Sequence, residues 1–119
     1  MKLILFTVEE ANQVVTAIRP LLERLIAGKH EMDALDRSIE ALTLALSGAS
    51  SDNPDARHLK QMVARRTRIA ERLRDGIHSI HQRGAVVKDL EQGLVDFYSV
   101  TGDRLIFLCW QLGEPSIAH

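Results

Sequence analysis

Charged side chains of the types that bind metals or small ligands gather in the last third of the sequence. They are Lys88, Asp89, Asp96, Arg104, Glu114 and His119. Carboxylates together with an imidazole could ligate Zn²⁺, Mn²⁺ or Fe²⁺, so this cluster is a candidate site for a divalent metal or a small molecule. The alternative is that these residues occupy turns and solvent-facing strand positions and form ordinary surface ion pairs, which is the commoner state of charged side chains.

A second group of charges follows one face of a predicted helix. It consists of Arg57, Lys60, Arg65, Arg68 and Arg72. A basic stripe of this kind could track the phosphates of a nucleic acid. Aromatic residues make up only 4% of the chain, however, so no interleaved rings are available to stack on bases. A solvated helix face, or one that pairs with an acidic helix, explains the stripe better.

No catalytic motif accompanies these charges. The sequence holds no glycine-rich phosphate loop, no Gly-x-Ser-x-Gly and no Cys-x-x-Cys. His78 and His81 lie three residues apart on a helix and could share a metal only if a third ligand joined them. The single cysteine, Cys109, lies in an apolar strand and is interpreted as a core residue. The sequence therefore leans toward a protein without enzymatic activity and requires no cofactor, although a divalent metal could bind.

The element that must position these residues is a long antiparallel helical hairpin, predicted over about 8–83. Thr7 and Glu10 form a capping box that starts the first helix. From Ile18 to Leu46 apolar residues recur at alternating spacings of three and four, which is the a/d seam of a coiled coil. A small polar stretch then predicts the turn, and Asn53-Pro54 starts a second helix with the same seam.

Antiparallel pairing of the two helices predicts which residues face each other. Gly28 falls opposite Gly76, which would let the helices approach closely or would leave a notch for a bulky side chain. Arg66 occupies a seam position where an aliphatic residue is expected, so we predict that it pairs with Asp36. A polar pair within an apolar seam commonly specifies the register of the two helices.

From Ala85 the pattern becomes strand-like and predicts a small antiparallel sheet over about 85–112. The turn residues Thr101-Gly102-Asp103 predict a hairpin. The last strand, 104–110, is apolar on both faces, which predicts a central strand that is covered twice. The opening segment 2–6 could join the same sheet. The predicted fold class is therefore α+β and mainly α, as a single domain over 1–119.

Three segments carry a recognisable combination of motifs. They are Phe6-Thr7-Val8-Glu9-Glu10-Ala11-Asn12, Lys88-Asp89-Leu90 with Gly93-Leu94-Val95-Asp96-Phe97, and Leu108-Cys109-Trp110 with Gly113-Glu114. Together they resemble the bacterial family called domain of unknown function 2203. Members of that family generally continue past the Gly-Glu pair to an aromatic-His pair and a glycine-rich tail, which this sequence, ending at His119, does not contain. The resemblance implies a fold and not an activity.

The partner predicted from the residues is a second copy of the chain. Residues Val14 to Ile26 form a wider apolar arc than the second helix can cover, so either the β segment or a second subunit packs there. We interpret the protein as a homodimeric, non-enzymatic interaction module, with a metal- or small-molecule-binding module and a nucleic-acid contact as the alternatives. The net charge of −1 favours neither anionic nor cationic partners. No stretch is long enough to span a membrane, and the single cysteine favours the cytoplasm.

Overall fold

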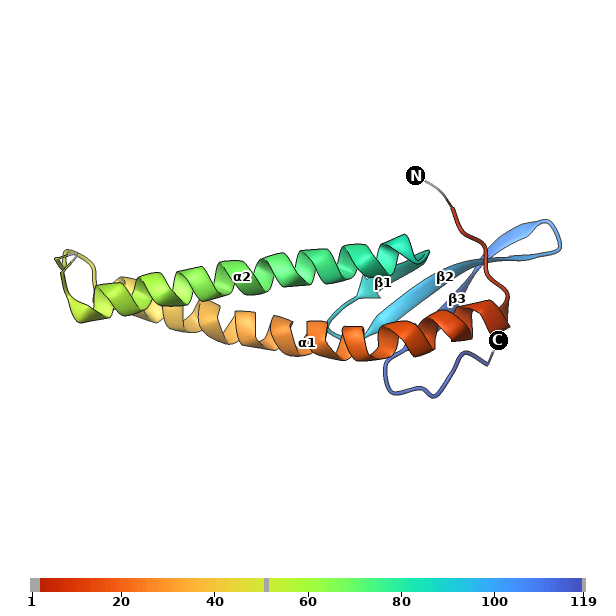
Figure 1. Cartoon of the computed structure of the whole chain (residues 1–119), viewed down its shortest axis with the longest axis horizontal. Coiled ribbons are helices and arrows are strands. Elements are labelled where there is room, and N and C mark those ends of the chain that lie inside the picture. Colours follow the sequence, from red (N-terminus) through yellow and green to blue (C-terminus); the bar gives the residue numbers. More distant parts are fainter. Residues whose placement is uncertain (1–2, 51, 119) are drawn as a thin grey trace. The chain divides into compact units, whose positions relative to one another are not determined.

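Two long helices followed by a three-stranded antiparallel sheet make up the fold. The computed structural model describes residues 3–50 and 52–118. The elements are α1 (Val8–Ala45), α2 (Pro54–Gln82), β1 (Ala85–Asp89), β2 (Leu94–Thr101) and β3 (Arg104–Gln111) (Figure 1). The predicted fold class, α+β and mainly α with a helical hairpin, is therefore confirmed.

Local hydrogen bonds explain where the helices begin. The amide of Glu10 donates to Thr7 Oγ1 at 3.1 Å, and the amide of Thr7 donates to Glu10 Oε1 at 2.9 Å. This reciprocal pair is the predicted capping box, and the hydrogen bonds from Thr7 lower the pKa of the Glu10 carboxyl. At the start of α2, Asn53 Oδ1 accepts a 2.8 Å hydrogen bond from the amide of Asp55, as an N-cap residue does.

Contacts within the chain group the residues into two compact units. Unit 1 combines Met1–Ile26 with Asp75–His119, and unit 2 is Ala27–Arg74. The boundary crosses both helices, so each unit contains one part of α1 and one part of α2. A single domain over 1–119, as the sequence predicts, remains a prediction.

The sheet of unit 1 has the order β1-β2-β3, with antiparallel pairing throughout. The strand β3 is therefore at an edge, and the prediction that it is central is wrong. Its strand neighbour is β2, to which it is joined by a two-residue turn at Gly102-Asp103, and β1 occupies the other side of β2. Gly102 has a φ of 63°, which suits the first central position of a type II′ hairpin turn.

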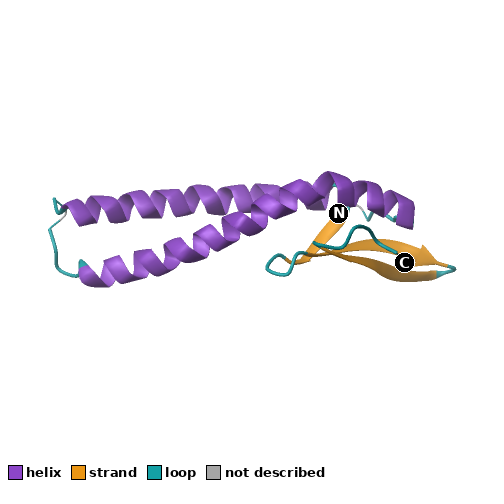
Figure 2. Ribbon diagram, turned by 90° about the horizontal axis from the view of Figure 1, so that it is seen from below, coloured by secondary structure: helices purple, strands orange, loops and turns teal. Residues whose placement is uncertain are grey.

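One face of the sheet and the first part of α1 form the core of unit 1 (Figure 2). Phe97 and Trp110 on that face are completely buried, as are Ile18 and Leu22 of α1. The Trp110 indole donates a 3.0 Å hydrogen bond to the Glu114 carbonyl. Four residues of the apolar arc of Val14 to Ile26 are buried within the chain, so most of the arc is not free to form the predicted dimer surface. They are Val15, Ile18, Leu22 and Leu25.

The N-terminal segment contacts the sheet without becoming a strand. The amide of Phe6 donates to the Tyr98 carbonyl at 2.8 Å, and the buried Ser99 hydroxyl donates to the Phe6 carbonyl at 2.6 Å. The Phe6 ring meets Phe97 edge to face, with ring centroids 5.2 Å apart. Residues 3–7 have no strand assignment, and the first residue of the predicted strand 2–6 lies outside the described residues.

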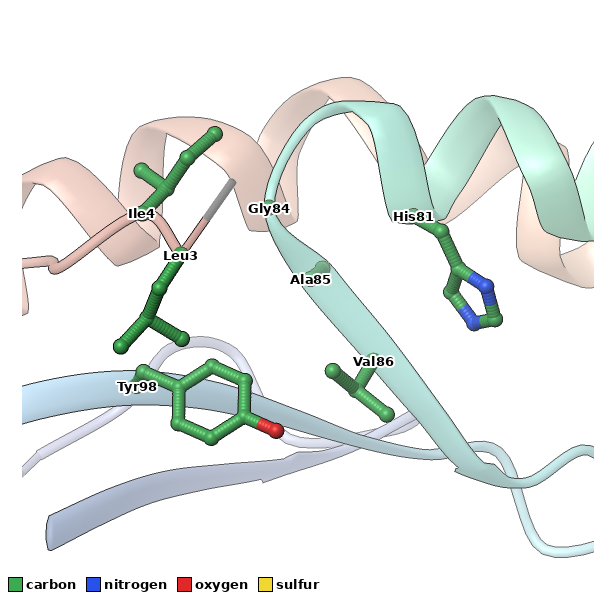
Figure 3. Close-up of a pocket in the computed structure, with 7 residues that line it drawn as sticks. All are labelled: Leu3, Ile4, His81, Gly84, Ala85, Val86 and Tyr98. Atoms are coloured by element: carbon green, nitrogen blue, oxygen red, sulfur yellow. The ribbon is translucent and has the colours of Figure 1, made fainter. Parts of the chain in front are cut away.

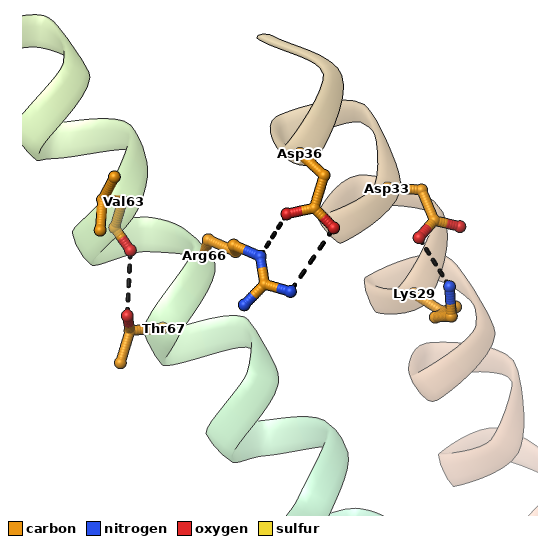
Figure 4. A network of polar contacts seen from close by, with 6 residues as sticks. All are labelled: Lys29, Asp33, Asp36, Val63, Arg66 and Thr67. Atoms are coloured by element: carbon orange, nitrogen blue, oxygen red, sulfur yellow. Dashed lines mark hydrogen bonds and ion pairs between the residues drawn. The ribbon is translucent and has the colours of Figure 1, made fainter. Parts of the chain in front are cut away.

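Unit 2 is held by a small number of buried side chains and by ion pairs between its helices. Ile69 and Leu73 are its buried apolar residues among those described. Arg66 Nε donates to Asp36 Oδ1, which is the pair that the sequence predicts, and Figure 4 shows it bridging the two helices. Both side chains are about half exposed, at 40% and 45%, so the pair lies at the margin of the seam and not in its core.

Leucine side chains occupy the space beside the two helix glycines, Gly28 and Gly76. A Cβ placed on Gly28 would lie 3.4 Å from Leu73 Cδ2, and one placed on Gly76 would press on the Leu25 side chain. Leu73 lies three residues before Gly76, and the direct pairing of Gly28 with Gly76 stays a prediction. The alternative that a glycine leaves a notch for a bulky side chain describes each position.

Candidate interaction surface

The outer face of the sheet, which points away from the core of unit 1, carries exposed apolar side chains. Alternation along the strands places Tyr98 and Val100 of β2 on this face, together with Leu105 and Phe107 of β3. We call these four residues the outer patch. Phe107 is 57% exposed, Leu105 54% and Val100 45%. An antiparallel sheet with one covered face normally presents polar residues on the other, so the outer patch departs from the usual pattern.

The outer patch is built from two cross-strand pairs. Tyr98 lies directly opposite Phe107, and Val100 lies directly opposite Leu105. The Tyr98 and Phe107 rings are in tilted contact, with centroids 5.0 Å apart. Cross-strand aromatic pairs stabilise a sheet, but here the outer side of the pair remains open to solvent. Contiguous apolar surface of this kind commonly marks a site of interaction with another protein.

A pocket of about 290 Å³ adjoins the outer patch. Tyr98 and Val86 form one wall, the N-terminal Leu3 and Ile4 form another, and His81 lies at one end (Figure 3). His81 Nε2 accepts a hydrogen bond from the Val87 amide at 3.3 Å, which orients the imidazole. Most of the wall is hydrocarbon, so the pocket extends the apolar character of the outer patch toward β1.

The structure brings together part of the predicted charged cluster. Asp96 lies opposite Cys109 in the β2–β3 register, which places its carboxylate beside the thiol. Partial burial and this interaction with Asp96 raise the pKa of the Cys109 thiol, and Lys88 and Glu114 lie close enough to affect it as well. Cys109 is exposed, so its interpretation as a core residue is wrong. A thiol with a raised pKa is a poor nucleophile near neutral pH.

The other members of the predicted cluster are elsewhere or have local roles. Asp89 accepts hydrogen bonds from the Gln92 amide at 3.1 Å and from its side chain at 3.2 Å, which stabilises the turn after β1. Arg104 is exposed at the far end of β3, and Glu114 Oε1 accepts a 2.6 Å hydrogen bond from the Gln111 amide. His119 lies outside the described residues. Within 3–50 and 52–118, no three His, Cys, Asp or Glu side chains converge as a metal site would require.

The predicted basic face is present on α2 as an exposed surface. Its five residues, Arg57, Lys60, Arg65, Arg68 and Arg72, are all exposed. Arg65 forms an ion pair with Glu31 of α1, so it also takes part in the contact between the helices of unit 2. A face that supplies one of its charges to the hairpin itself fits the interpretation of an ordinary solvated helix surface.

Sequence reasoning missed the outer patch. The one sequence feature that points to it is that strand 104–110 is apolar on both faces. This pattern predicts that both faces are covered, but it does not show what covers the second face. Among residues 3–50 and 52–118, the chain covers the face with Leu108 and Trp110 and leaves Leu105 and Phe107 exposed. A strand that is apolar on both faces and lies at the edge of a sheet is therefore a candidate interaction surface.

The architecture defines a class of protein in which a helical hairpin carries a small antiparallel sheet. A family model described as an uncharacterized conserved protein, DUF2203, matches residues 4–119. The chain therefore belongs to the DUF2203 family. No curated protein and no solved structure gives a significant match to it. Neither helix, over its described residues, is long and apolar enough to cross a lipid bilayer.

Proposed function

We propose that this protein is a non-enzymatic interaction module that works as a homodimer, and that its self-association uses the outer patch. The observation that carries the proposal is the exposure of Phe107 and Leu105 on a strand whose other face is buried. Burial of such side chains is the main favourable contribution to protein association. A second copy presents the same patch, so two patches can meet at the two-fold axis of a closed dimer.

The charged residues support this proposal better than a ligand-binding function. Asp89 and Glu114 satisfy backbone amides of their own turns, and Asp96 interacts with Cys109. These are structural roles, and they leave fewer free ligands for a metal or an anionic substrate. The single cysteine is in keeping with a reducing compartment, so we propose a cytoplasmic location.

Sedimentation velocity of the untagged protein tests the proposal. We expect a dimer at micromolar concentration, and we expect Phe107→Ser to raise the dissociation constant about tenfold or more, because a central aromatic contact is a typical hot spot. The matched control is Val63→Ser, which removes an exposed apolar side chain, 44% exposed, from unit 2. A monomeric wild-type protein, or equal effects of the two substitutions, would overturn the proposal.

A further inference from the structure

The two edges of the sheet differ in how they are protected. The strand β1 has only five residues, and its pairing with β2 shifts register between Val87 and Asp89. On the same side of β2, before β1 begins, the Phe6 amide donates a hydrogen bond to the Tyr98 carbonyl. The strand β3 has eight residues, pairs with β2 without a shift, and contains neither proline nor lysine. Natural edge strands are usually short, bulged, charged or covered, because an open edge pairs readily with another strand. The edge at β3 carries a charge only at its first residue, Arg104, and it is neither short nor bulged.

The backbone groups on that edge can be identified from the hairpin. A two-residue turn makes Thr101 and Arg104 a hydrogen-bonded pair, so the bonding alternates from there along β3. The N–H and C=O groups of Leu105, Phe107 and Cys109 consequently point away from β2. Gln111 continues this alternation, and its amide indeed bonds outward to the Glu114 carboxylate. Within the described residues, no other chain segment bonds the outward groups of the three preceding positions.

The open part of the edge is symmetric about one residue. It is limited on one side by the turn that precedes Arg104 and on the other by Gln111, whose amide is already bonded to Glu114. Phe107 is at its centre, with one outward-bonding residue on either side. We infer that β3 pairs antiparallel with β3 of a second copy, with Phe107 on the two-fold axis and Leu105 opposite Cys109 of the other copy. This inference rests on the proposed function and specifies the contact that the dimer makes.

The charges at the two ends of β3 complement each other in this register. Arg104 is exposed and forms no ion pair among the described residues. Two-fold pairing centred on Phe107 places Arg104 opposite Trp110 of the second copy. There it lies next to the second copy's Glu114 carboxylate, which accepts a hydrogen bond from the Gln111 amide. Asp103 belongs to the turn and lies beyond the paired residues. Each copy thus offers a guanidinium at one end and a carboxylate at the other, which favours the antiparallel register over a parallel one.

Disulfide trapping tests the register. The variant Leu105→Cys keeps the natural Cys109, and the inferred pairing brings the introduced thiol opposite Cys109 of the second copy. Residues in a hydrogen-bonded antiparallel pair have Cα atoms about 5.5 Å apart, which is within the range that a disulfide spans. Four positions along one strand span about 13 Å, so the same two thiols cannot join within a single chain. Oxidation is carried out at mildly alkaline pH because the pKa of the Cys109 thiol is raised.

We expect Leu105→Cys to give a covalent dimer on a non-reducing gel, with peptide mapping that joins position 105 to Cys109 of the other copy. The wild type is the first control and stays uncrosslinked, because Cys109 does not face itself in this register. The second control is Val100→Cys, which lies on the outer patch but on the central strand, away from the edge. A dimer in which only Val100→Cys crosslinks would mean that the outer patches stack face to face, which overturns the register and leaves the proposed function standing. A protein that sediments as a monomer overturns both.

Discussion

Unit 1 and unit 2 contain parts of the same two helices, yet different forces hold those parts together. In unit 1, Trp110, Phe97, Ile18, Leu22 and Ile80 are completely buried. In unit 2, the buried apolar residues among those described are Ile69 and Leu73, and the remaining contacts include half-exposed ion pairs. The difference arises because the sheet gives unit 1 a second layer, whereas two helices alone can bury only a narrow stripe of side chains.

This contrast indicates where stability resides in the molecule. Burial of apolar surface contributes much more free energy than a solvent-exposed ion pair does. The pair Arg66–Asp36 joins the two helices of unit 2 and is therefore expected to orient them more than to stabilise them. The pair Lys29–Asp33, which Figure 4 also shows, lies within α1. Local unfolding should begin in unit 2 and should reach unit 1 only in global unfolding.

The largest expected effect comes from the core of unit 1. Trp110→Ala removes a completely buried ring, its hydrogen bond to Glu114 and its contact with the Arg19 guanidinium, which lies 5.3 Å from the ring centre. We expect the free energy of unfolding to fall by about 3–5 kcal/mol. Urea denaturation followed by far-UV circular dichroism measures it. The control is Val63→Ala in unit 2, with an expected change within about 0.5 kcal/mol, and equal losses would show that the two units do not differ as described.

The packing of the two units can also be compared by making the same substitution, glycine to alanine, in each of them. Gly28→Ala in unit 2 meets Leu73 at an ordinary contact distance of 3.4 Å, so the better helix propensity of alanine should stabilise the protein by about 0.5–1 kcal/mol. Gly76→Ala in unit 1 presses on Leu25, whose Cγ and Cδ1 would both lie 3.2 Å from the new methyl group. Leu25 is buried, so neighbouring side chains restrict its movement, and we expect a loss of about 1–3 kcal/mol.

The two substitutions are expected to change the free energy of unfolding in opposite directions, and this difference is what the experiment tests. Thermal and urea unfolding of both proteins, with the wild type alongside, give the two changes under the same conditions. If Gly76→Ala also stabilised the protein, Leu25 would have room to move and the packing of unit 1 would be looser than its burial indicates.

The helices and strands could be predicted because their signals are local. The capping box at Thr7, the N-cap at Asn53 and the turn at Gly102 act over two to four residues, and each is found as predicted. The Arg66–Asp36 pair could also be found, since a hairpin turn constrains which residues of two helices come close. The side chains beside Gly28 and Gly76, which are Leu73 and Leu25, could not be predicted because they depend on how the two helices pack.

The candidate interaction surface could not be predicted, because it depends on the order of strands and on what covers each face. An apolar strand such as β3 has the same alternation whether it is central or at an edge. The charged cluster as a binding site stays a prediction, and the spacing of its members depends on the same strand register. Asp96 meets Cys109 through strand register, whereas Arg104, in the same predicted cluster, lies at the opposite end of β3.

The smallest expected effect concerns the ion pair of unit 2. Asp36→Ala removes the partner of Arg66, whose pKa is raised by the hydrogen bond and the charge of Asp36. A half-exposed ion pair contributes little to stability, so we expect the melting temperature to fall much less than in Trp110→Ala. Hydrogen exchange of the amides around Arg66 should nevertheless become faster, because the loss acts on local opening of unit 2.

The matched control for this prediction is Glu40→Ala, which removes an exposed carboxylate of α1 that forms no ion pair among the described residues. It should leave exchange around Arg66 unchanged. Because salt screens exposed charges, the difference between Asp36→Ala and the wild type should shrink at about 1 M salt. If Asp36→Ala instead lowered the melting temperature as much as Trp110→Ala does, the ion pair would be a major source of stability. The two units would then not differ in the kind of force that holds them.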